Sequence, residues 1–251
     1  MNTNDATAKR IMELAERAYS ENRFFFTDFL DMSQLSVFYA MEKEVGYAGT
    51  CVSGGKDGCD RCMVRFGSPE LCGYEEEFPI DILYITPLQK KFSEELTHRD
   101  FLGSVIGLGI ERTKLGDILV RENAAYIFVA DSISDYIIEN LNQVKHTNVQ
   151  VERCTELPEE LAPKYSEESI VVSSNRLDAV VARAFNLSRE NAAGLISEGK
   201  VFVSGREILS VSKALKDGDV LSVRGKGKLI FCGEEGVSRK NKLYIKIKRY
   251  V

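Results

Sequence analysis

Four of the six cysteines gather in one short stretch, where their thiols could hold a metal ion. Cys59 and Cys62 form a CxxC pair, and Cys51 and Cys72 flank it. Four thiolates would suit zinc, but zinc modules usually bring a second closely spaced CxxC pair. The spacing therefore favours reduced thiols in a loop. Cys59 and Cys62 remain the candidates for a metal, and no cofactor is expected.

The same stretch contains a glycine-rich loop. Residues 53–58 read Ser-Gly-Gly-Lys-Asp-Gly, close to the Ser-Gly-Gly-x-Asp-Ser loop with which ATP pyrophosphatases hold phosphates. Gly58 replaces the last serine, and residues 46–52 make a poor core strand for the parallel sheet that this chemistry needs. A flexible loop near RNA is the favoured interpretation. An RNA-modifying enzyme, of the tRNA sulfur-transfer type, is the alternative.

The tripeptide His98-Arg99-Asp100 matches the catalytic loop of protein kinases. No asparagine follows at the required position, and the chain lacks both Asp-Phe-Gly and a glycine-rich nucleotide loop. The only other histidine is His146, and no nucleophile–base arrangement can be assigned. We therefore expect no enzymatic activity. Asp100 would favour a helix N-terminus, and His98 and Arg99 are candidates for facing RNA.

Segment 173–228 has the residue pattern of a phosphate-binding module. It predicts one helix from residues 176–178 onward, a second helix from 188–189, and strands over 200–205 and 220–224. Two short helices feeding a small sheet would bring a helix N-terminus and glycine-rich turns to one side. Backbone N–H groups on such a surface favour anions such as phosphate.

Charge is distributed unevenly along the chain. Residues 170–251 hold 16 Lys+Arg against 8 Asp+Glu, which leaves 17 against 30 in residues 1–169. The net charge of −5 therefore hides a basic C-terminal end and an acidic remainder. This basic end predicts a surface that contacts successive phosphates of a nucleic-acid backbone. Its strip of cations comprises Arg224, Lys226, Lys228, Arg239, Lys240, Lys242, Lys246, Lys248 and Arg249.

The periodicities predict an α+β fold with several domains. Residues 1–76 begin with amphipathic helical patterns and form an N-terminal helical or α/β domain. Residues 77–156 follow the order β-α-β-β-α-β of ferredoxin-like and RNA-recognition domains. An acidic link over 156–168 precedes a third domain over 170–251. The central strands are expected at 80–86, 116–120, 125–130 and 149–153, the central helices at 97–108 and 133–144, and a half-buried terminal strand at 243–249.

Three stretches carry a resemblance to a known family. They are Thr97–Gly103 with its continuation to Leu119, the Arg-Leu-Asp…Ser-Arg module, and Val223–Lys228. The module resembles the S-four (αL-motif) RNA-binding domain, and the whole chain resembles the YlmH family of bacterial S-four-domain proteins. One departure is Ser204, where these modules usually have Asn in a Val-Asn-Gly turn.

The resemblance implies a non-enzymatic RNA binder that acts on the ribosome. Its relatives include small S-four proteins that hold tRNA on stalled large subunits during ribosome-associated quality control. The family is also linked to cell division, which leaves a protein-docking adaptor as a further alternative.

We therefore expect a cytoplasmic protein that binds ribosomal RNA and tRNA on the large ribosomal subunit, with no membrane partner. The N-terminus has no signal-peptide pattern. Tyr126 and Phe128 are interpreted as strand residues rather than a base-stacking platform. No catalytic residue is assigned. The candidate RNA-binding residues are Arg176, Ser188, Arg189, Lys200, Arg224, Lys226, Lys228, Arg239, Lys240, His98 and Arg99.

Overall fold

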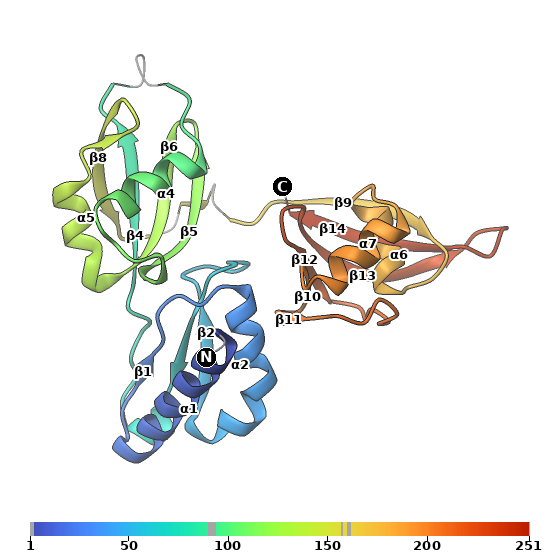
Figure 1. The fold of residues 1–251 in the computed structure, drawn as a ribbon, viewed down its shortest axis with the longest axis horizontal. Coiled ribbons are helices and arrows are strands. Elements are labelled where there is room, and N and C mark those ends of the chain that lie inside the picture. Colours follow the sequence, from blue (N-terminus) through green and yellow to red (C-terminus); the bar gives the residue numbers. More distant parts are fainter. Residues whose placement is uncertain (1–2, 90–93, 157, 160–161, 251) are drawn as a thin grey trace. The chain divides into compact units, whose positions relative to one another are not determined.

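The computed structural model describes residues 3–89, 94–156, 158–159 and 162–250 (Figure 1). It divides into two compact units, one of Met1–Gln34 with Met41–Ala162 and one of Leu35–Ala40 with Pro163–Val251. No helix in the described part of the chain is both long and apolar enough to cross a membrane. The predicted three-domain division is finer than these two units.

The N-terminal region contains two long helices and a small antiparallel sheet, ordered β1-β3-β2. Helix α1 buries its periodic apolar residues, among them Ile11, Leu14 and Ala18, as their spacing predicts. Asp31 is the N-cap of helix α2, and its side chain accepts from the backbone N–H of Gln34 in a capping box. The elements are α1 (Thr3–Glu21), β1 (Phe25–Phe26), α2 (Met32–Val45), η1 (Gly46–Ala48), β2 (Thr50–Ser53), β3 (Met63–Phe66) and α3 (Pro69–Cys72).

The central region carries a five-stranded antiparallel sheet, ordered β5-β6-β4-β8-β7, with α4 and α5 on one face (Figure 1). Strand residues such as Leu83 and Ile127 pack against Phe101 of α4 in its core. Glu122 and Asn123 both take positive φ, at 45° and 64°, which suits a tight hairpin turn. The elements are β4 (Ile80–Pro87), α4 (His98–Gly107), η3 (Arg112–Lys114), β5 (Leu115–Arg121), β6 (Ala124–Ala130), η4 (Asp131–Ile133), α5 (Ser134–Asn140), β7 (Gln143–Val144) and β8 (Thr147–Cys154).

The second central helix is shorter than the sequence predicts. α5 ends at Asn140 rather than near residue 144, because Leu141 leaves the helical conformation (φ −86°, ψ 89°) and β7 pairs with β8. Asp131 belongs to a 3₁₀ turn instead of capping α5. The α-helix starts at Ser134, whose hydroxyl donates to the Asp131 carbonyl oxygen at 2.6 Å.

The C-terminal region builds a six-stranded antiparallel sheet, ordered β11-β10-β12-β13-β14-β9, with α6 and α7 against one face (Figure 1). Leu177 and Ile196 of the helices share a core with Leu221 and Ile245 of the strands. The elements are β9 (Tyr165–Val172), α6 (Leu177–Ala184), α7 (Arg189–Ser197), β10 (Val201–Val203), β11 (Arg206–Glu207), β12 (Val220–Val223), β13 (Gly227–Val237) and β14 (Leu243–Tyr250).

Strand β9 lies partly where the sequence predicts an acidic link. It starts at Tyr165, and it pairs with the whole of β14, from Tyr165↔Tyr250 to Val172↔Leu243. The exposed acidic residues of β9 face the basic residues of β14. Opposite charges on neighbouring strands stabilise such a pair, but an acidic sequence gives no alternating apolar pattern that would predict it.

Candidate nucleic-acid interface

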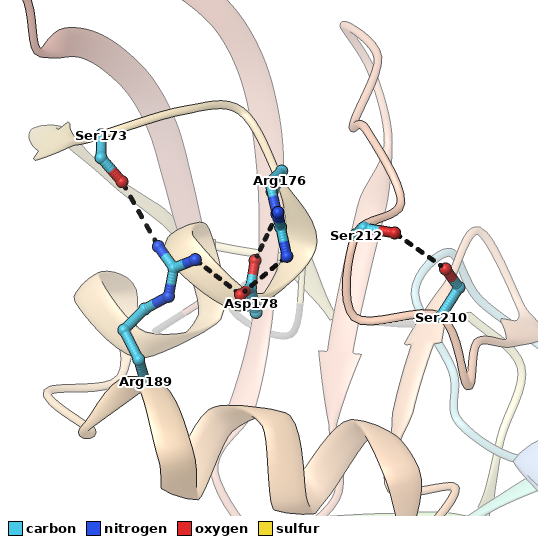
Figure 2. Close-up of polar contacts among 6 residues, drawn as sticks. All are labelled: Ser173, Arg176, Asp178, Arg189, Ser210 and Ser212. Carbon is cyan, nitrogen blue, oxygen red and sulfur yellow. Dashed lines mark hydrogen bonds and ion pairs between the residues drawn. The ribbon is translucent and has the colours of Figure 1, made fainter.

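The carboxylate of Asp178 organises two of the predicted RNA-binding arginines (Figure 2). It accepts hydrogen bonds from Arg176 Nε at 3.2 Å and from Arg189 Nη2 at 2.6 Å. The Asp178 side chain is 8% exposed, whereas those of Arg176 and Arg189 are 44% and 48% exposed. One buried carboxylate therefore holds two guanidinium groups at the surface.

Backbone contacts fix the position of this cluster. Leu177 and Asp178 donate their backbone N–H groups to the carbonyl oxygens of Lys213 and Val211, which pins the first turn of α6 to a loop. Arg189 also donates from Nη1 to the Ser173 hydroxyl at 3.3 Å, so the cluster joins the end of β9, α6 and α7 (Figure 2). A guanidinium has five N–H donors, so each arginine keeps donors that these contacts do not use.

Ser188 is the N-cap of α7. Its hydroxyl accepts from the backbone N–H of Asn191 at 3.0 Å, as the Ser188-Arg189 pattern leads one to expect for a helix start. The capping contact places Arg189 in the first turn of the helix, next to Asp178. Ser188 thus positions its neighbour through the backbone.

Lys200 and Arg224 lie side by side, just before β10 begins and just after β12 ends. The backbone N–H of Arg224 donates to the Lys200 carbonyl oxygen at 2.9 Å. The Lys200 ammonium pairs with Glu198 at 2.6 Å, and the Arg224 guanidinium lies 5.8 Å from the ring centre of Phe202. A surface ion pair leaves a lysine accessible to water, so both cations can still meet a phosphate.

Two hairpins of the sheet, β12–β13 and β13–β14, present further predicted cations. Lys226 is exposed in the turn between β12 and β13, and the Lys228 ammonium lies 5.7 Å from the ring centre of Tyr250. Arg239 and Lys240 are exposed in the turn between β13 and β14. The predicted basic face is therefore spread over two turns as well as the helix pair.

The terminal strand contributes less positive charge than its sequence suggests. β14 buries Ile245 and Ile247, as the apolar alternation predicts. On its other face Lys246 and Lys248 pair with Glu167 of β9, at 2.7 and 3.1 Å. Hydrogen bonds from the two lysines hold the pKa of Glu167 below its ordinary value, so the acid stays ionised and offsets these cations. Arg249 likewise pairs with Glu168 of β9.

His98 and Arg99 open α4 in the other unit. Thr97 and Asp100 form a capping box there, in which the backbone N–H of Thr97 donates to the Asp100 carboxylate at 2.8 Å. Burial, and then the nearby Arg112 cation, lower the pKa of His98 from its ordinary value. A neutral histidine adds no positive charge, which leaves Arg99 as the cation at this helix start.

The glycine- and cysteine-rich loop is held by polar contacts to the central sheet. The Asp117 carboxylate accepts from the backbone N–H groups of Asp60 and Arg61, at 2.8 and 3.1 Å. The Arg61 side chain donates to the carbonyl oxygens of Leu115 and Phe29, at 2.8 and 2.9 Å. Asp117 belongs to the family-like stretch noted above, so part of that motif positions this loop.

The same loop is closed upon itself. The Cys59 thiol donates to the Gly54 carbonyl oxygen, and a Cβ atom at Gly54 would lie 2.4 Å from the Cβ of Cys59. Burial, together with Asp117, raises the pKa of Cys59, which keeps it a thiol rather than the thiolate that binds metal. Among the described residues, no three His, Cys, Asp or Glu side chains cluster around a possible metal position. Cys59 and Cys62 therefore have no third ligand there.

Asp178 and Ser173 are the interface residues that sequence reasoning missed. Asp178 follows Arg176 by two positions in the first turn of α6, and this spacing was the available signal. Ser173 gave none, because its contact with Arg189 depends on how β9 packs.

Two family models match parts of this chain. Residues 74–157 match the model described as "Putative RNA-binding domain in YlmH", and residues 175–221 match the S4 domain. The S4 match covers Arg176, Asp178 and Arg189 of the cluster, the strands β10 and β11, and the first half of β12.

Individual proteins are also similar. The "Ribosome-associated protein quality control protein P2" of Bacillus subtilis is 29% identical over 229 residues, which cover 90% of this chain and 88% of that protein. Small ribosomal subunit protein uS4 of Kosmotoga olearia is 39% identical over 74 residues, or 28% of this chain and 36% of that protein. The solved structure of "Cell division protein ylmH from Streptococcus pneumoniae" has a TM-score of 0.49 and 26% identity, covering 61% of this chain and 93% of that one. The predicted resemblance to the YlmH family is thereby confirmed: a stretch that matches the YlmH RNA-binding model is followed by an S4 domain.

Proposed function

We propose that this chain is a non-enzymatic, cytoplasmic RNA-binding protein that contacts ribosomal RNA and tRNA on the large ribosomal subunit. The Asp178 cluster carries the proposal, because one buried carboxylate holds the guanidinium groups of Arg176 and Arg189 half-exposed on the S4 domain. Planar guanidinium groups with unused N–H donors suit paired hydrogen bonds to phosphate oxygens.

The type of contact indicates recognition of RNA shape rather than base sequence. The candidate residues of the second unit are mostly cations on a helix start and on β-turns, which meet phosphate and sugar. If about six phosphates are neutralised, log affinity falls against log salt with a slope of roughly −4 to −5.

The cellular role follows from the similar protein of Bacillus subtilis. That relative is named for ribosome-associated protein quality control, and it aligns with 90% of this chain. We extend this role to the present chain, with tRNA on a stalled large subunit as the bound species. The central sheet, in the order β5-β6-β4-β8, supports a ferredoxin-like assignment of residues 77–156, and Arg99 at the start of α4 would be its RNA contact.

A sucrose-gradient fractionation of cell lysate tests the proposal. The chain is followed by immunoblot across free, small-subunit, large-subunit and polysome fractions, at low and at moderate salt. We expect it with the large subunit at low salt and at the top of the gradient at moderate salt, because counterion release makes phosphate contacts salt-sensitive.

Three outcomes would contradict the proposal. Migration only at the top of the gradient at low salt would exclude a stable complex with the large subunit. Co-migration that survives both nuclease treatment and moderate salt would indicate a protein-docking adaptor instead. ATP turnover by the purified protein would overturn the non-enzymatic assignment.

A further inference from the structure

A hollow of about 490 Å³ opens beside Arg189 in the second unit. Its walls come from the end of β9, from α6 with the turn that follows it, and from the turn between β13 and β14. Its charged lining residues are Arg183, Arg189 and Lys242, and no acidic residue lines it. Cations from three separate segments therefore face one space.

Two of these cations have no acidic counterpart. Arg183 and Lys242 are exposed, and within the described part of the chain neither side chain makes a hydrogen bond or an ion pair. Lys200 and Lys246, by contrast, pair with Glu198 and Glu167. Uncompensated charges around a concave surface concentrate positive potential there, because low-dielectric walls focus the field.

The third cation is held in place. Arg189 is tied to Asp178 and Ser173, so its guanidinium does not need to be ordered when a ligand binds. Asn186 also lines the hollow and adds amide donors. The hollow thus combines one preorganised arginine with two exposed cations and a neutral donor, which is the chemistry of a phosphate oxygen site.

We propose that this hollow binds the phosphodiester backbone of RNA through Arg183, Arg189 and Lys242. The inference deepens the proposed function and rests on it. A polymer fits better than a single free phosphate, because the hollow is much larger than one phosphate group and its cations come from separate segments. Lys242 lies beyond residue 221, where the S4 match ends. The β13–β14 hairpin would therefore extend the phosphate-binding surface of the S4 domain.

A double substitution of the two uncompensated cations tests this site. Arg183→Gln with Lys242→Gln removes both charges from exposed positions outside the core, so the fold is retained. The control is Lys9→Gln with Arg10→Gln, which removes the same charge from exposed positions on α1 in the other unit. The full-length proteins bind fluorescein-labelled fragments of large-subunit ribosomal RNA, and anisotropy gives the affinity over a series of KCl concentrations.

We expect the salt slope of the Arg183/Lys242 variant to be shallower than that of the wild type by about two units, one for each lost phosphate contact. The Lys9/Arg10 control should keep the wild-type slope. An unchanged slope in the Arg183/Lys242 variant, with salt-dependent wild-type binding, overturns this site and leaves the proposed function standing. Salt-independent wild-type binding overturns both. Displacement of the RNA by AMP at matched ionic strength would overturn the polymer assignment.

Discussion

Asp178 accepts a 2.6 Å hydrogen bond from Arg189, and this ion pair ties the first turn of α6 to the first turn of α7. The two partners sit in different surroundings, since the Asp178 side chain is 8% exposed and that of Arg189 is 48% exposed. The carboxylate is part of the packed domain, whereas the guanidinium reaches solvent. A substitution of Asp178 should therefore affect stability as well as RNA binding, whereas a substitution of Arg189 should affect mainly RNA binding.

Asp178→Asn should lower both stability and RNA affinity. The amide cannot accept ionic hydrogen bonds from Arg176 and Arg189 together, and loss of a charged hydrogen bond at a buried position costs about 2 kcal/mol. Urea denaturation gives the free energy of unfolding, and anisotropy gives the affinity for RNA. Glu190→Gln, at an exposed carboxylate in the first turn of α7, is the control. Equal stability of the two variants would show that Asp178 does not hold the cluster together.

Arg189→Ala with Lys226→Ala should weaken RNA binding without unfolding the protein. Both side chains are exposed, and Asp178 keeps Arg176 as its partner. We expect the salt slope to become shallower by about two units and the thermal midpoint to change little. Removing Lys246 and Lys248 in the same way should change the slope less, because Glu167 already offsets these two cations. The reverse ranking would place the RNA on β14.

Glu167→Gln should strengthen RNA binding and steepen its salt dependence. The substitution releases Lys246 and Lys248 from their acidic partner, so both can meet phosphates. An affinity that falls, or a slope that stays the same, would show that this face of β14 does not meet RNA.

The same substitution should alter the response to acid. Because the pKa of Glu167 is lowered in the folded state, its contribution to stability is present above its ordinary value of 4.5. That contribution is lost as the pH falls through the lowered pKa. Glu167→Gln removes it at every pH. The urea midpoints of the two proteins should therefore differ at neutral pH and converge in acid.

Cys59 should react with iodoacetamide much more slowly than Cys51. Cys51 is exposed, whereas Cys59 is partly buried with a raised pKa, and only the thiolate attacks. Asp117→Asn removes one of the causes of that raised pKa and weakens two backbone contacts that close the loop, so Cys59 should then react faster. Mass spectrometry of the labelled peptides follows both sites. An equal rate at Cys51 and Cys59 in the wild type would show that the loop is open.

Local signals were enough to predict α1, α4, α6 and α7 and the main strands of the central sheet. The apolar spacing of α1 and the serine at the start of α7 each act within a few residues, and both were confirmed. The failures are at positions where a distant partner decides. β9 exists because β14 pairs with it, and α5 stops early because β7 pairs with β8.

In the candidate site, too, local signals predict the residues and distant partners decide their arrangement. Arg176, Ser188 and Arg189 could be singled out by residue type and by their place at helix starts. Their mutual arrangement through Asp178 is tertiary, and so is the pairing that neutralises Lys246. Residue type gives the sign of a charge, but the fold decides which charges remain uncompensated. For that reason Arg183 gave no signal in the sequence, and Lys242 could not be told apart from the other cations of the basic strip.

Ser204→Asn should raise the stability of the S4 domain. Ser204 and Gly205 form the turn after β10, and Ser204 has a φ of 49°, in the left-handed region that asparagine tolerates better than serine. The Ser204 hydroxyl also accepts from the backbone N–H of Val220 at 3.4 Å, a contact that the asparagine side-chain oxygen can replace. We expect a gain of about 0.5 kcal/mol in the free energy of unfolding by urea. Ser204→Ala, which loses the acceptor and gains no conformational tolerance, should be less stable than the wild type. If asparagine ranks below serine, the hydroxyl contacts outweigh the backbone strain, and the departure from the family's usual turn is favourable in this chain.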